Sequence, residues 1–367
     1  MRKRTSETPD YALMLTIFAL LIFGLIMVSS ASVVIAYENF GDKYYLLKHQ
    51  LSYGVITGIL GWVVTQRFHY QKLQKFAFLL LIITLAFLVL VFFPGVGASY
   101  KGAQRWVNLG LFQFQPTELA KITFIIYLAA WLSKKGGAIR DVSLGFMPFL
   151  MVMGVITLLI ALQPDVSTLA IIALTGCIVY FVAGGRLRHL FVVAIIAALI
   201  LFLLIQAAPY RLARFTVFLH PEVDPQGVGY QVNQALMAIG SGGIFGVGLG
   251  HSRQKYNYLP EPAGDSIFSI IGEELGLIGV SILLVLLFIL AIRGFRIAAR
   301  APDQFGRLLA TGITSWFIFQ AFIHISANLA IIPLTGIPLP FISYGGSSLA
   351  FSLIAAGILL NISKYSH

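Results

Sequence analysis

The sequence predicts an all-α polytopic membrane protein with about ten transmembrane helices. Apolar residues make up 58% of its 367 residues and charged residues only 11%. The chain contains repeated charge-poor stretches, several close to the ~20 residues that an α-helix needs to cross a bilayer. These are continuous apolar runs, unlike the alternating segments of about ten residues in a closed β-barrel. Helices are therefore expected to span the membrane.

The predicted spans follow one another along the whole chain. We expect them at residues 12–32, 50–66, 76–93, 117–133, 145–163, 167–184, 188–207, 266–292, 308–330 and 343–362. The first run lacks a small-residue cleavage site, so it is interpreted as a span and not as a signal peptide. Residues 1–367 show no soluble domain, low-complexity tract or clear internal repeat, which indicates a single integral domain.

The distribution of Lys and Arg predicts the orientation. With the N-terminus inside, 16 of the 25 Lys and Arg residues lie on the cytoplasmic side and 8 outside. Because cytoplasmic loops carry an excess of these residues, both termini are expected in the cytoplasm. The long loop between spans seven and eight, about 208–265, then faces the extracytoplasmic side.

The net charge of +11 is mainly explained by this same bias. No basic stripe is interleaved with aromatic residues in a soluble domain, so nucleic-acid binding is not expected. The single cysteine, Cys177, allows neither an intramolecular disulfide nor a cysteine metal site. Basic residues outside could face an anionic lipid: Lys101, Arg105, Arg211, Arg214, Arg253 and Lys255.

The segment between spans three and four ends in a helix start at Pro116-Thr117. Glu118 and Lys121 are spaced i,i+3, so they can pair on one face of that helix. The pair is either a structural ion pair between helices or a polar lining of a cavity, where Lys121 could contact a phosphate. Under both interpretations it faces away from lipid.

A short turn joins spans five and six at Gln163-Pro164-Asp165. Proline breaks the helix, and Asp165 can cap the next one by accepting bonds from its free N–H groups. The alternative is that Asp165 orients a substrate or holds a cation.

The long loop begins with turn residues at His220–Tyr230 and continues with a short amphipathic helix at Gln231–Ile239. The glycine-rich segment 240–255 lacks the context of a dinucleotide or P-loop fingerprint. Its glycines are expected to form tight turns; the alternative is a nest of N–H groups that binds phosphate.

Asp265 closes this loop at a membrane boundary, where ionisable groups are costly and indicate function. It either caps the eighth span or acts as a general base. Glu273 lies eight residues further, about two helical turns deeper. We expect Glu273 or Glu274 to point into the bundle interior.

The last polar segment contains four helix breakers, Pro333, Gly336, Pro338 and Pro340. Non-helical backbone is tolerated at membrane depth only where protein or a water-filled cavity satisfies it. A re-entrant loop that lines a site is therefore predicted.

Together these motifs resemble the SEDS family (shape, elongation, division and sporulation) of bacterial cell-wall proteins. The matching motifs, in chain order, are Lys101-Gly-Ala-Gln-Arg-Trp106, Phe114-Gln-Pro-Thr-Glu118-Leu-Ala-Lys121, Gln163-Pro-Asp165, Asp224-Pro-Gln-Gly-Val-Gly-Tyr230, Ala238-Ile-Gly-Ser-Gly-Gly243, Tyr258-Leu-Pro-Glu261, Gly272-Glu-Glu-Leu-Gly276 and Pro338-Leu-Pro-Phe-Ile-Ser-Tyr-Gly-Gly-Ser-Ser348.

The segments 41–45, 246–255 and 357–363 are more similar to the division members of the family than to its elongation members. One segment departs from the family pattern. The family usually has His-Thr-Asp-Phe-Ile-Phe where this chain has Ala263-Gly264-Asp265-Ser266-Ile267-Phe268. The aspartate is kept, while its neighbours differ.

The resemblance implies a peptidoglycan glycosyltransferase that polymerises lipid II on the outer face of the bacterial cytoplasmic membrane during septal wall synthesis. It implies that Asp265 is the catalytic base. Candidate substrate-binding residues are Arg105, Glu118, Lys121, Asp165, Arg211, Arg214, Gln231, Arg253 and Ser343.

Two other functions remain open: a lipid II flippase without polymerase activity, and a scaffold that only recruits wall enzymes. The expected partners are lipid II, a class B penicillin-binding transpeptidase, other divisome proteins and membrane lipids. No cofactor is assigned, although Asp165, Glu273 or Glu274 could hold a divalent cation such as Mg²⁺ or Mn²⁺.

Overall fold

The computed structural model describes residues 8–100, 103–108, 110, 113–206, 209–219 and 227–366. In this part of the chain, seven helices are long and apolar enough to cross a membrane. They are α1 (Tyr11–Ala31), α5 (Gln71–Leu90), Val142–Leu162 (a π-helical turn, Val142–Phe146, continued by α7, Met147–Leu162), α9 (Leu187–Gln206), α12 (Ile267–Arg300), α13 (Gln304–Asn328) and α14 (Gly346–Ser363).

The other three predicted spans also coincide with helices, although these are shorter. They are α4 (Thr57–Arg67), which continues a π-helical segment Gln50–Ile56, α6 (Pro116–Leu132) and α8 (Val166–Val182). Each predicted range thus falls on a helix. The count of ten membrane crossings stays a prediction, because only seven helices among the described residues are long and apolar enough to cross a membrane.

Local sequence explains where several helices begin. Asp10, Asp165 and Asp303 are the N-caps of α1, α8 and α13, and each side chain accepts a hydrogen bond from a backbone N–H of the first turn. Pro116 occupies the first turn of α6, where the missing N–H costs nothing.

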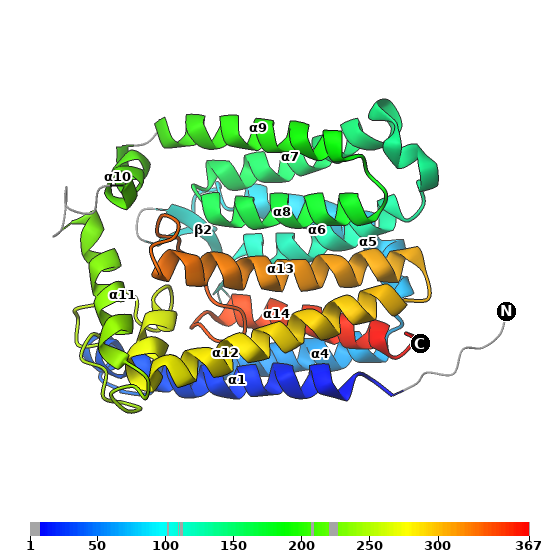
Figure 1. The fold of residues 1–367 in the computed structure, drawn as a ribbon. Coiled ribbons are helices and arrows are strands. Elements are labelled where there is room, and N and C mark those ends of the chain that lie inside the picture. The colour runs from blue at the N-terminus through cyan, green and yellow to red at the C-terminus, as the bar shows by residue number, and fades with distance from the viewer. Residues whose placement is uncertain are drawn as a thin grey trace.

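The helices run side by side along one axis (Figure 1). One end, which we call the termini end, carries both described chain ends and the turn between α12 and α13. The opposite end, the site end, carries α10 (Pro209–Leu219), α11 (Val228–Gly242) and a small sheet. Both described chain ends therefore lie at the same end of the bundle; which side of the membrane that end faces stays a prediction.

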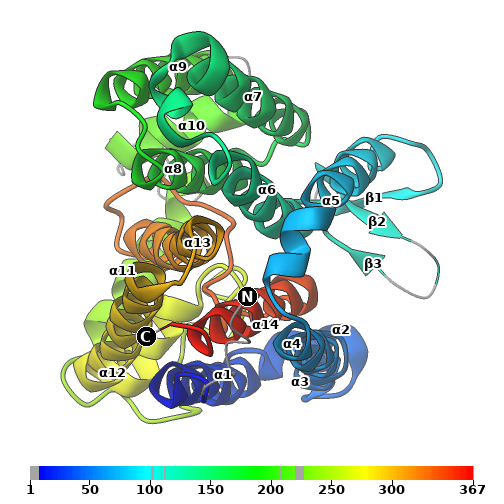
Figure 2. The ribbon, with the colours of Figure 1, turned by 90° about the vertical axis from the view of Figure 1, so that its right-hand side faces the viewer.

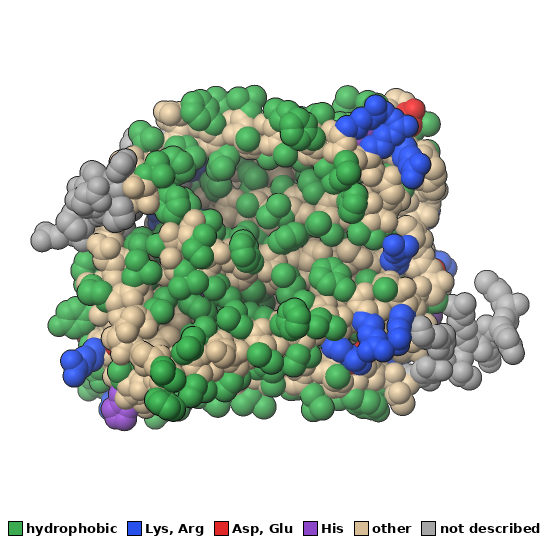
Figure 3. Space-filling model, in the orientation of Figure 1, with side chains coloured by type: hydrophobic (Ala, Val, Ile, Leu, Met, Phe, Trp, Pro, Cys, Tyr) green, Lys and Arg blue, Asp and Glu red, His purple; other side chains and the backbone are tan. Residues whose placement is uncertain are grey.

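α13 and α14 lie at the centre of the bundle, and α9 lies at its edge (Figure 2). In the most apolar window, 78% of α13 and of α14 is buried, against 11% of α9. Outer helices expose large apolar side chains such as Phe78, Leu79 and Phe191. Figure 3 shows such hydrophobic side chains along the helices and Lys and Arg at the ends, as expected for a surface that contacts lipid.

The prediction of an all-α fold missed a small antiparallel sheet. Strands β1 (Gly97–Tyr100), β2 (Ala103–Asn108) and β3 (Gln113–Phe114) pair in that order, with Gly97 opposite Val107 and Val107 opposite Phe114. The sequence gives no signal for them, because β3 has only two residues and Ala103-Gln-Arg-Trp-Val-Asn108 does not alternate between apolar and polar residues. Lys101 lies outside the described residues.

The predicted loop 208–265 contains two helices. The predicted amphipathic helix Gln231–Ile239 is confirmed as part of α11, whereas α10 was not predicted. Residues 220–226, with most of the predicted turn, lie outside the described residues. α2 (Val33–Phe40) and α3 (Tyr45–His49) fill the connection between α1 and the Gln50–Ile56 segment.

α12 ends eight residues beyond the predicted boundary at 292, so Arg293, Arg296 and Arg300 belong to the helix and not to the following loop. The long arginine side chains can keep their charge in water while the helix continues. Arg293 also pairs with Asp10, with Nη2 and Oδ2 2.6 Å apart.

Candidate active site

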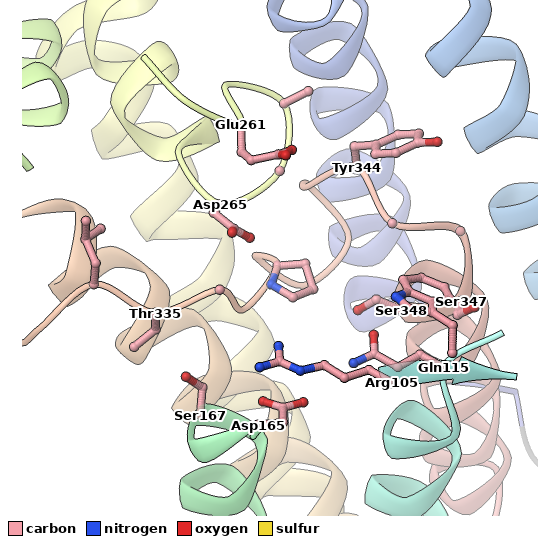
Figure 4. Close-up of a pocket in the computed structure, with 18 of the residues that line it drawn as sticks. Arg105, Gln115, Asp165, Ser167, Glu261, Asp265, Thr335, Tyr344, Ser347 and Ser348 are labelled. Carbon is pink, nitrogen blue, oxygen red and sulfur yellow. The ribbon is translucent and has the colours of Figure 1, made fainter. Parts of the chain in front are cut away.

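A cavity of about 1900 Å³ opens at the site end of the bundle. Segments that are far apart in sequence line it: β2 with Arg105, the start of α8 with Asp165, α10, the segment 261–265, the irregular segment 332–345 and the first turn of α14. Figure 4 shows the side chains of Asp265 and Arg105 directed into this space from different elements. The predicted re-entrant segment 333–348 lines this cavity and is non-helical up to residue 345, while its last three residues form the first turn of α14.

Asp265 lies two residues before α12, at the partial positive charge of that helix terminus, which favours a carboxylate. The N-cap residue of α12 is Ser266. The Asp265 carboxylate lies close to Gly336 of the irregular segment. A Cβ added at Gly336 would be only 3.3 Å from Asp265 Oδ2. Asp265 lines the cavity and is partly buried.

Hydrogen bonds from α13 and from the irregular segment fix the backbone around Asp265. Asn328 of α13 donates to the Asp265 carbonyl at 2.9 Å. The Ser343 hydroxyl donates to the Gly264 carbonyl at 2.8 Å, and the Tyr344 N–H donates to the Ala263 carbonyl at 2.8 Å. The position of the carboxylate is therefore set by packed elements and not by a free loop.

One of the residues that departs from the family pattern takes part in this support. The Ser266 hydroxyl donates to the Pro260 carbonyl at 2.9 Å and lies 3.2 Å from Gln231 Nε2 of α11. A phenylalanine at position 266 could make neither bond. In this chain, hydrogen bonds of Ser266 hold the turn before α12.

Ser343 and Gln231 were predicted to bind substrate, but in the structure both side chains contact the segment that carries Asp265. Ser343 is 3% exposed, and its hydroxyl bonds the Leu339 N–H and the Gly264 carbonyl, both at 2.8 Å. Neither Ser343 nor Gln231 is among the residues that line the cavity. Their contacts make them positioning residues for the Asp265 segment.

Ser343→Ala is expected to lower the free energy of unfolding by about 1–3 kcal/mol, because it leaves a buried N–H and a buried carbonyl without this hydroxyl. Thermal unfolding of the purified protein in detergent measures the change. Ser52→Ala is the control, since the exposed Ser52 hydroxyl bonds only carbonyls of its own helical segment. Equal melting temperatures for the two variants would contradict the positioning role.

Arg105 ties the sheet to the turn before α8. Its Nε donates to the Gln163 carbonyl at 3.0 Å and its Nη2 donates to the Pro164 carbonyl. The predicted cap at Asp165 is confirmed: its carboxylate accepts from the Thr168 N–H at 3.1 Å and from the Thr168 hydroxyl at 2.8 Å. Both Arg105 and Asp165 also line the cavity.

α10 brings two further guanidinium groups, those of Arg211 and Arg214, to the same cavity. Arg211 Nη1 donates to the Leu204 carbonyl at 2.9 Å, which connects α10 to α9. Arg105, Arg211 and Arg214 therefore place positive charge around one space that also contains Asp265.

Glu118 and Lys121 do not line this cavity. Their side chains are buried, with Lys121 Nζ 2.9 Å from Glu118 Oε1 and 2.8 Å from Gln320 Oε1 of α13. The Trp316 ring covers the ammonium at 4.9 Å. The geometry favours the structural ion pair over a cavity lining. Because Gln320 Nε2 donates to the Pro338 carbonyl at 2.8 Å, the pair also supports the irregular segment.

Glu273 and Glu274 point into the protein interior, as expected, and both bind the glycine-rich segment. Glu273 accepts from the Arg253 N–H at 2.8 Å, and Glu274 pairs with Lys255 at 3.0 Å. Among the described residues, no group of three or more His, Cys, Asp or Glu is placed to hold a metal ion. The exposed Arg253 side chain is not part of the cavity lining.

The glycine-rich segment forms tight turns, as predicted. Gly243, Gly246, Gly248 and Gly250 all have positive φ, between 54° and 103°. The N–H of Gly246 donates to Gly242 at 2.8 Å and that of Gly248 to Glu274 at 3.0 Å. These N–H groups are used inside the protein, which contradicts the alternative of a phosphate-binding nest at these positions.

Several cavity residues had no assigned role in the sequence. Glu261 belongs to a family motif, but no pattern pointed to its side chain. His49 and Tyr344 also line the cavity, and His49 Nδ1 lies 3.1 Å from the Tyr344 hydroxyl. No sequence signal joins these two residues, because they lie almost 300 positions apart.

Comparison with known proteins agrees with this architecture. Residues 11–367 match the FtsW/RodA/SpoVE family model, described as cell cycle protein. The chain is 45% identical over 354 residues to the probable peptidoglycan glycosyltransferase FtsW of Trichlorobacter lovleyi, covering 96% of this chain and 93% of that protein. It is 43% identical over 364 residues to stage V sporulation protein E of Bacillus subtilis, covering 99% of each.

Solved structures share the fold. A chain from a structure described as "Structural coordination of polymerization and crosslinking by a peptidoglycan synthase complex" matches with a TM-score of 0.80 and 28% identity, over 98% of this chain and 99% of that one. The rod shape determining protein RodA of Thermus thermophilus matches with a TM-score of 0.72 and 27% identity, over 98% of each chain. The resemblance seen in the sequence is confirmed: this chain belongs to the FtsW, RodA and SpoVE family of cell cycle proteins.

Proposed function

We propose that this protein is a peptidoglycan glycosyltransferase that polymerises lipid II into β-1,4-linked glycan strands. The observation that carries the proposal is the composition of the cavity: Asp265 shares a space of about 1900 Å³ with three guanidinium groups, and the carboxylates of Glu38, Asp165 and Glu261 also line it. Relatives named as peptidoglycan glycosyltransferases support the same activity.

The cavity also offers apolar walls, which suit a lipid-linked substrate. Hydrophobic lining residues come from α9, α13, α14 and the irregular segment, among them Leu201, Leu204, Ile323, Ile332, Phe351 and Ile354. A polyprenyl chain would lie along such walls while the diphosphate and the sugars occupy the polar part. This division matches the general design of ligand sites, with mostly apolar linings and few placed polar groups.

In the proposed reaction, Asp265 is the general base. Its carboxylate takes the proton from the C4 hydroxyl of the acceptor sugar. The resulting oxygen bonds to the anomeric carbon of the donor while the bond from that carbon to the diphosphate oxygen breaks, and the diphosphate leaves with the electron pair. A single displacement with inversion gives a β-1,4 linkage, and a positioned base contributes about 10²–10⁴-fold to such a step.

The leaving diphosphate needs positive charge where its negative charge develops. Arg105, Arg211 and Arg214 line the cavity and are the proposed diphosphate ligands. Asp165 orients the turn to which Arg105 is bonded, through its cap on α8. Arg253, outside the cavity lining, remains a candidate only for an incoming chain at the outer surface.

The apolar helices support a multi-pass membrane protein. We place it in the bacterial cytoplasmic membrane with its termini end in the cytoplasm and its site end outside. The FtsW relatives support a role in septal wall synthesis during division. The similarity to stage V sporulation protein E supports wall synthesis during sporulation as the other role. The neighbour from a peptidoglycan synthase complex supports a class B penicillin-binding transpeptidase as the partner.

The proposal is tested with purified full-length protein in detergent, incubated with lipid II alone and with the partner transpeptidase. Gel electrophoresis of the glycan products is expected to show polymer in at least the sample with partner. A parallel assay in vesicles measures transfer of fluorescent lipid II between leaflets. Lipid transfer without polymer, with the partner present, would favour the flippase and overturn the proposal.

A further inference from the structure

A second cavity lies at the termini end, far from the candidate active site. It measures about 620 Å³ and lies between the segment that precedes α7 and the turn between α8 and α9. Three of its lining residues are arginines, Arg140, Arg186 and Arg188. We call this cavity, with Gly137, Asp141, Val142 and Ser143 as its other lining residues, the arginine pocket.

Two separate connections are held together to form the arginine pocket. Arg140 ends a 3₁₀ turn, Gly136–Arg140, while Arg188 lies in the first turn of α9. Arg140 Nε donates to the Gly184 carbonyl at 3.4 Å, which joins the two connections. Gly184 has φ of +105°, a conformation that favours glycine, so the turn before Arg186 is locally determined.

The pocket carries a net positive charge. Its one acidic lining residue, Asp141, is already engaged: Oδ1 accepts from the N–H groups of Ser143 and Leu144 at 2.8 and 3.0 Å and from the Ser143 hydroxyl at 2.6 Å. These hydrogen bonds, that of the Ser143 side chain first, hold the pKa of Asp141 below its usual value. The pocket thus contains three guanidinium groups and one carboxylate, and that carboxylate is hydrogen-bonded within residues 141–144.

Exposed apolar side chains lie directly beside these charges. Val142 and Leu144 of the π-helical turn and Met147 at the start of α7 are 51%, 55% and 50% exposed. Leu187 and Phe191 at the start of α9 are 69% and 68% exposed. In Figure 3, a group of Lys and Arg side chains at the upper right borders hydrophobic side chains of the helices. The arginine pocket is therefore adjacent to an exposed apolar surface of the kind that contacts lipid.

Three other basic residues at the termini end contact side chains of the protein. Lys72 lies 5.3 Å from the Phe68 ring centroid, Lys135 lies 5.5 Å from that of Trp131, and Arg293 pairs with Asp10. An excess of cytoplasmic Lys and Arg explains why such residues are present. It does not explain why three arginines from two connections meet around one pocket.

We propose that the arginine pocket binds the phosphate-bearing headgroup of an anionic phospholipid of the surrounding membrane. The planar guanidinium fork matches phosphate oxygens in pairs, and basic pockets between helices at a membrane face suit such headgroups. The acyl chains then follow the exposed side chains of Leu144, Met147, Leu187 and Phe191. The bound lipid bridges the α7 and α9 ends of the outer helix layer.

The test is a titration of the purified full-length protein in detergent with phosphatidylglycerol, followed by native mass spectrometry. The first phosphatidylglycerol molecule is expected to bind with a lower dissociation constant than the first phosphatidylcholine molecule. The triple variant Arg140→Gln, Arg186→Gln, Arg188→Gln is expected to weaken that first binding by about 100-fold, since each basic residue near an anionic headgroup contributes about fivefold. If the triple variant does not fold, Arg188→Gln alone is expected to weaken it about fivefold.

The matched control removes three arginines from the same end of the bundle: Arg296→Gln, Arg300→Gln, Arg307→Gln. All three are exposed and none lines the pocket. This control is expected to bind phosphatidylglycerol like the unchanged protein. Equal loss in both triple variants, or equal binding of the two lipids, would overturn the proposal. In a further titration, glycerol phosphate competes with bound phosphatidylglycerol. If it displaces the lipid at the same concentration as added phosphatidylglycerol does, the ligand is a soluble phosphate and not a membrane lipid.

Discussion

Asp265→Asn is expected to lower glycan polymer formation by at least about 100-fold, because the amide cannot accept the proton of the acceptor hydroxyl. The substitution keeps the size of the side chain, and the backbone bonds from Asn328 to Asp265 and from Ser343 to Gly264 do not depend on the carboxylate. The melting temperature is therefore expected to change little. Polymer length and yield on gels, with purified protein, partner and lipid II, measure the effect.

Glu38→Gln is the matched control for charge. Glu38 lines the same cavity, and its carboxylate accepts from Asn257 Nδ2 at 2.9 and 3.0 Å. Polymer yield is expected to stay within about twofold, since exposed polar pairs contribute little. A fully active Asp265→Asn variant would show that another group takes the proton. Glu261, which also lines the cavity, would then be the next candidate.

Lys121→Met is expected to lower the free energy of unfolding by about 3–5 kcal/mol, the usual cost of breaking a buried ion pair by removing one partner. The Glu118 carboxylate would lose its cation in the bundle interior, where both side chains are almost fully buried. The contact of Nζ with Gln320 Oε1 would also disappear. Thermal unfolding in detergent measures the loss.

The double variant Lys121→Met, Glu118→Gln separates stability from catalysis. Replacing both charges by neutral groups of similar volume is often close to neutral for stability, so most of the loss is expected to be recovered. If the pair is structural, polymer formation recovers together with the melting temperature. A double variant that is stable but inactive would instead indicate that Lys121 takes part in substrate binding.

The sequence predicted the helices well because their signal is local. Continuous apolar runs marked all ten ranges, and caps such as Asp165 marked where helices begin. The boundaries were less certain where polar residues continue a helix. α12 continues past Arg293 to Arg300 because a long side chain can reach water without ending the helix.

Short elements without a continuous apolar run were not predicted. The sheet β1–β3 is built from strands of two to six residues, and α10 follows the end of α9 without an apolar run of its own length. Such elements form because neighbouring segments pair or pack on them. The strands do not alternate strictly, and α10 is a short amphipathic helix, so neither matches the continuous apolar runs that marked the spans.

The candidate site divides in the same way. Motifs and resemblance singled out Asp265, Arg105 and Asp165, and packing brings these three to one cavity. The i,i+3 spacing correctly placed Glu118 and Lys121 in contact. Which way that pair faces depends on Gln320 and Trp316 of α13, almost 200 residues away.

By itself, the sequence determined the helical membrane architecture, the family and the aspartate at the start of α12, because hydrophobic runs and contiguous motifs are properties of short segments. Only the tertiary structure decided which polar side chains share the cavity and which support the segment that carries Asp265. Ser343 and Gln231 are the clearest cases: the directions of their side chains, and the partners they reach on distant segments, exist only once the helices have packed.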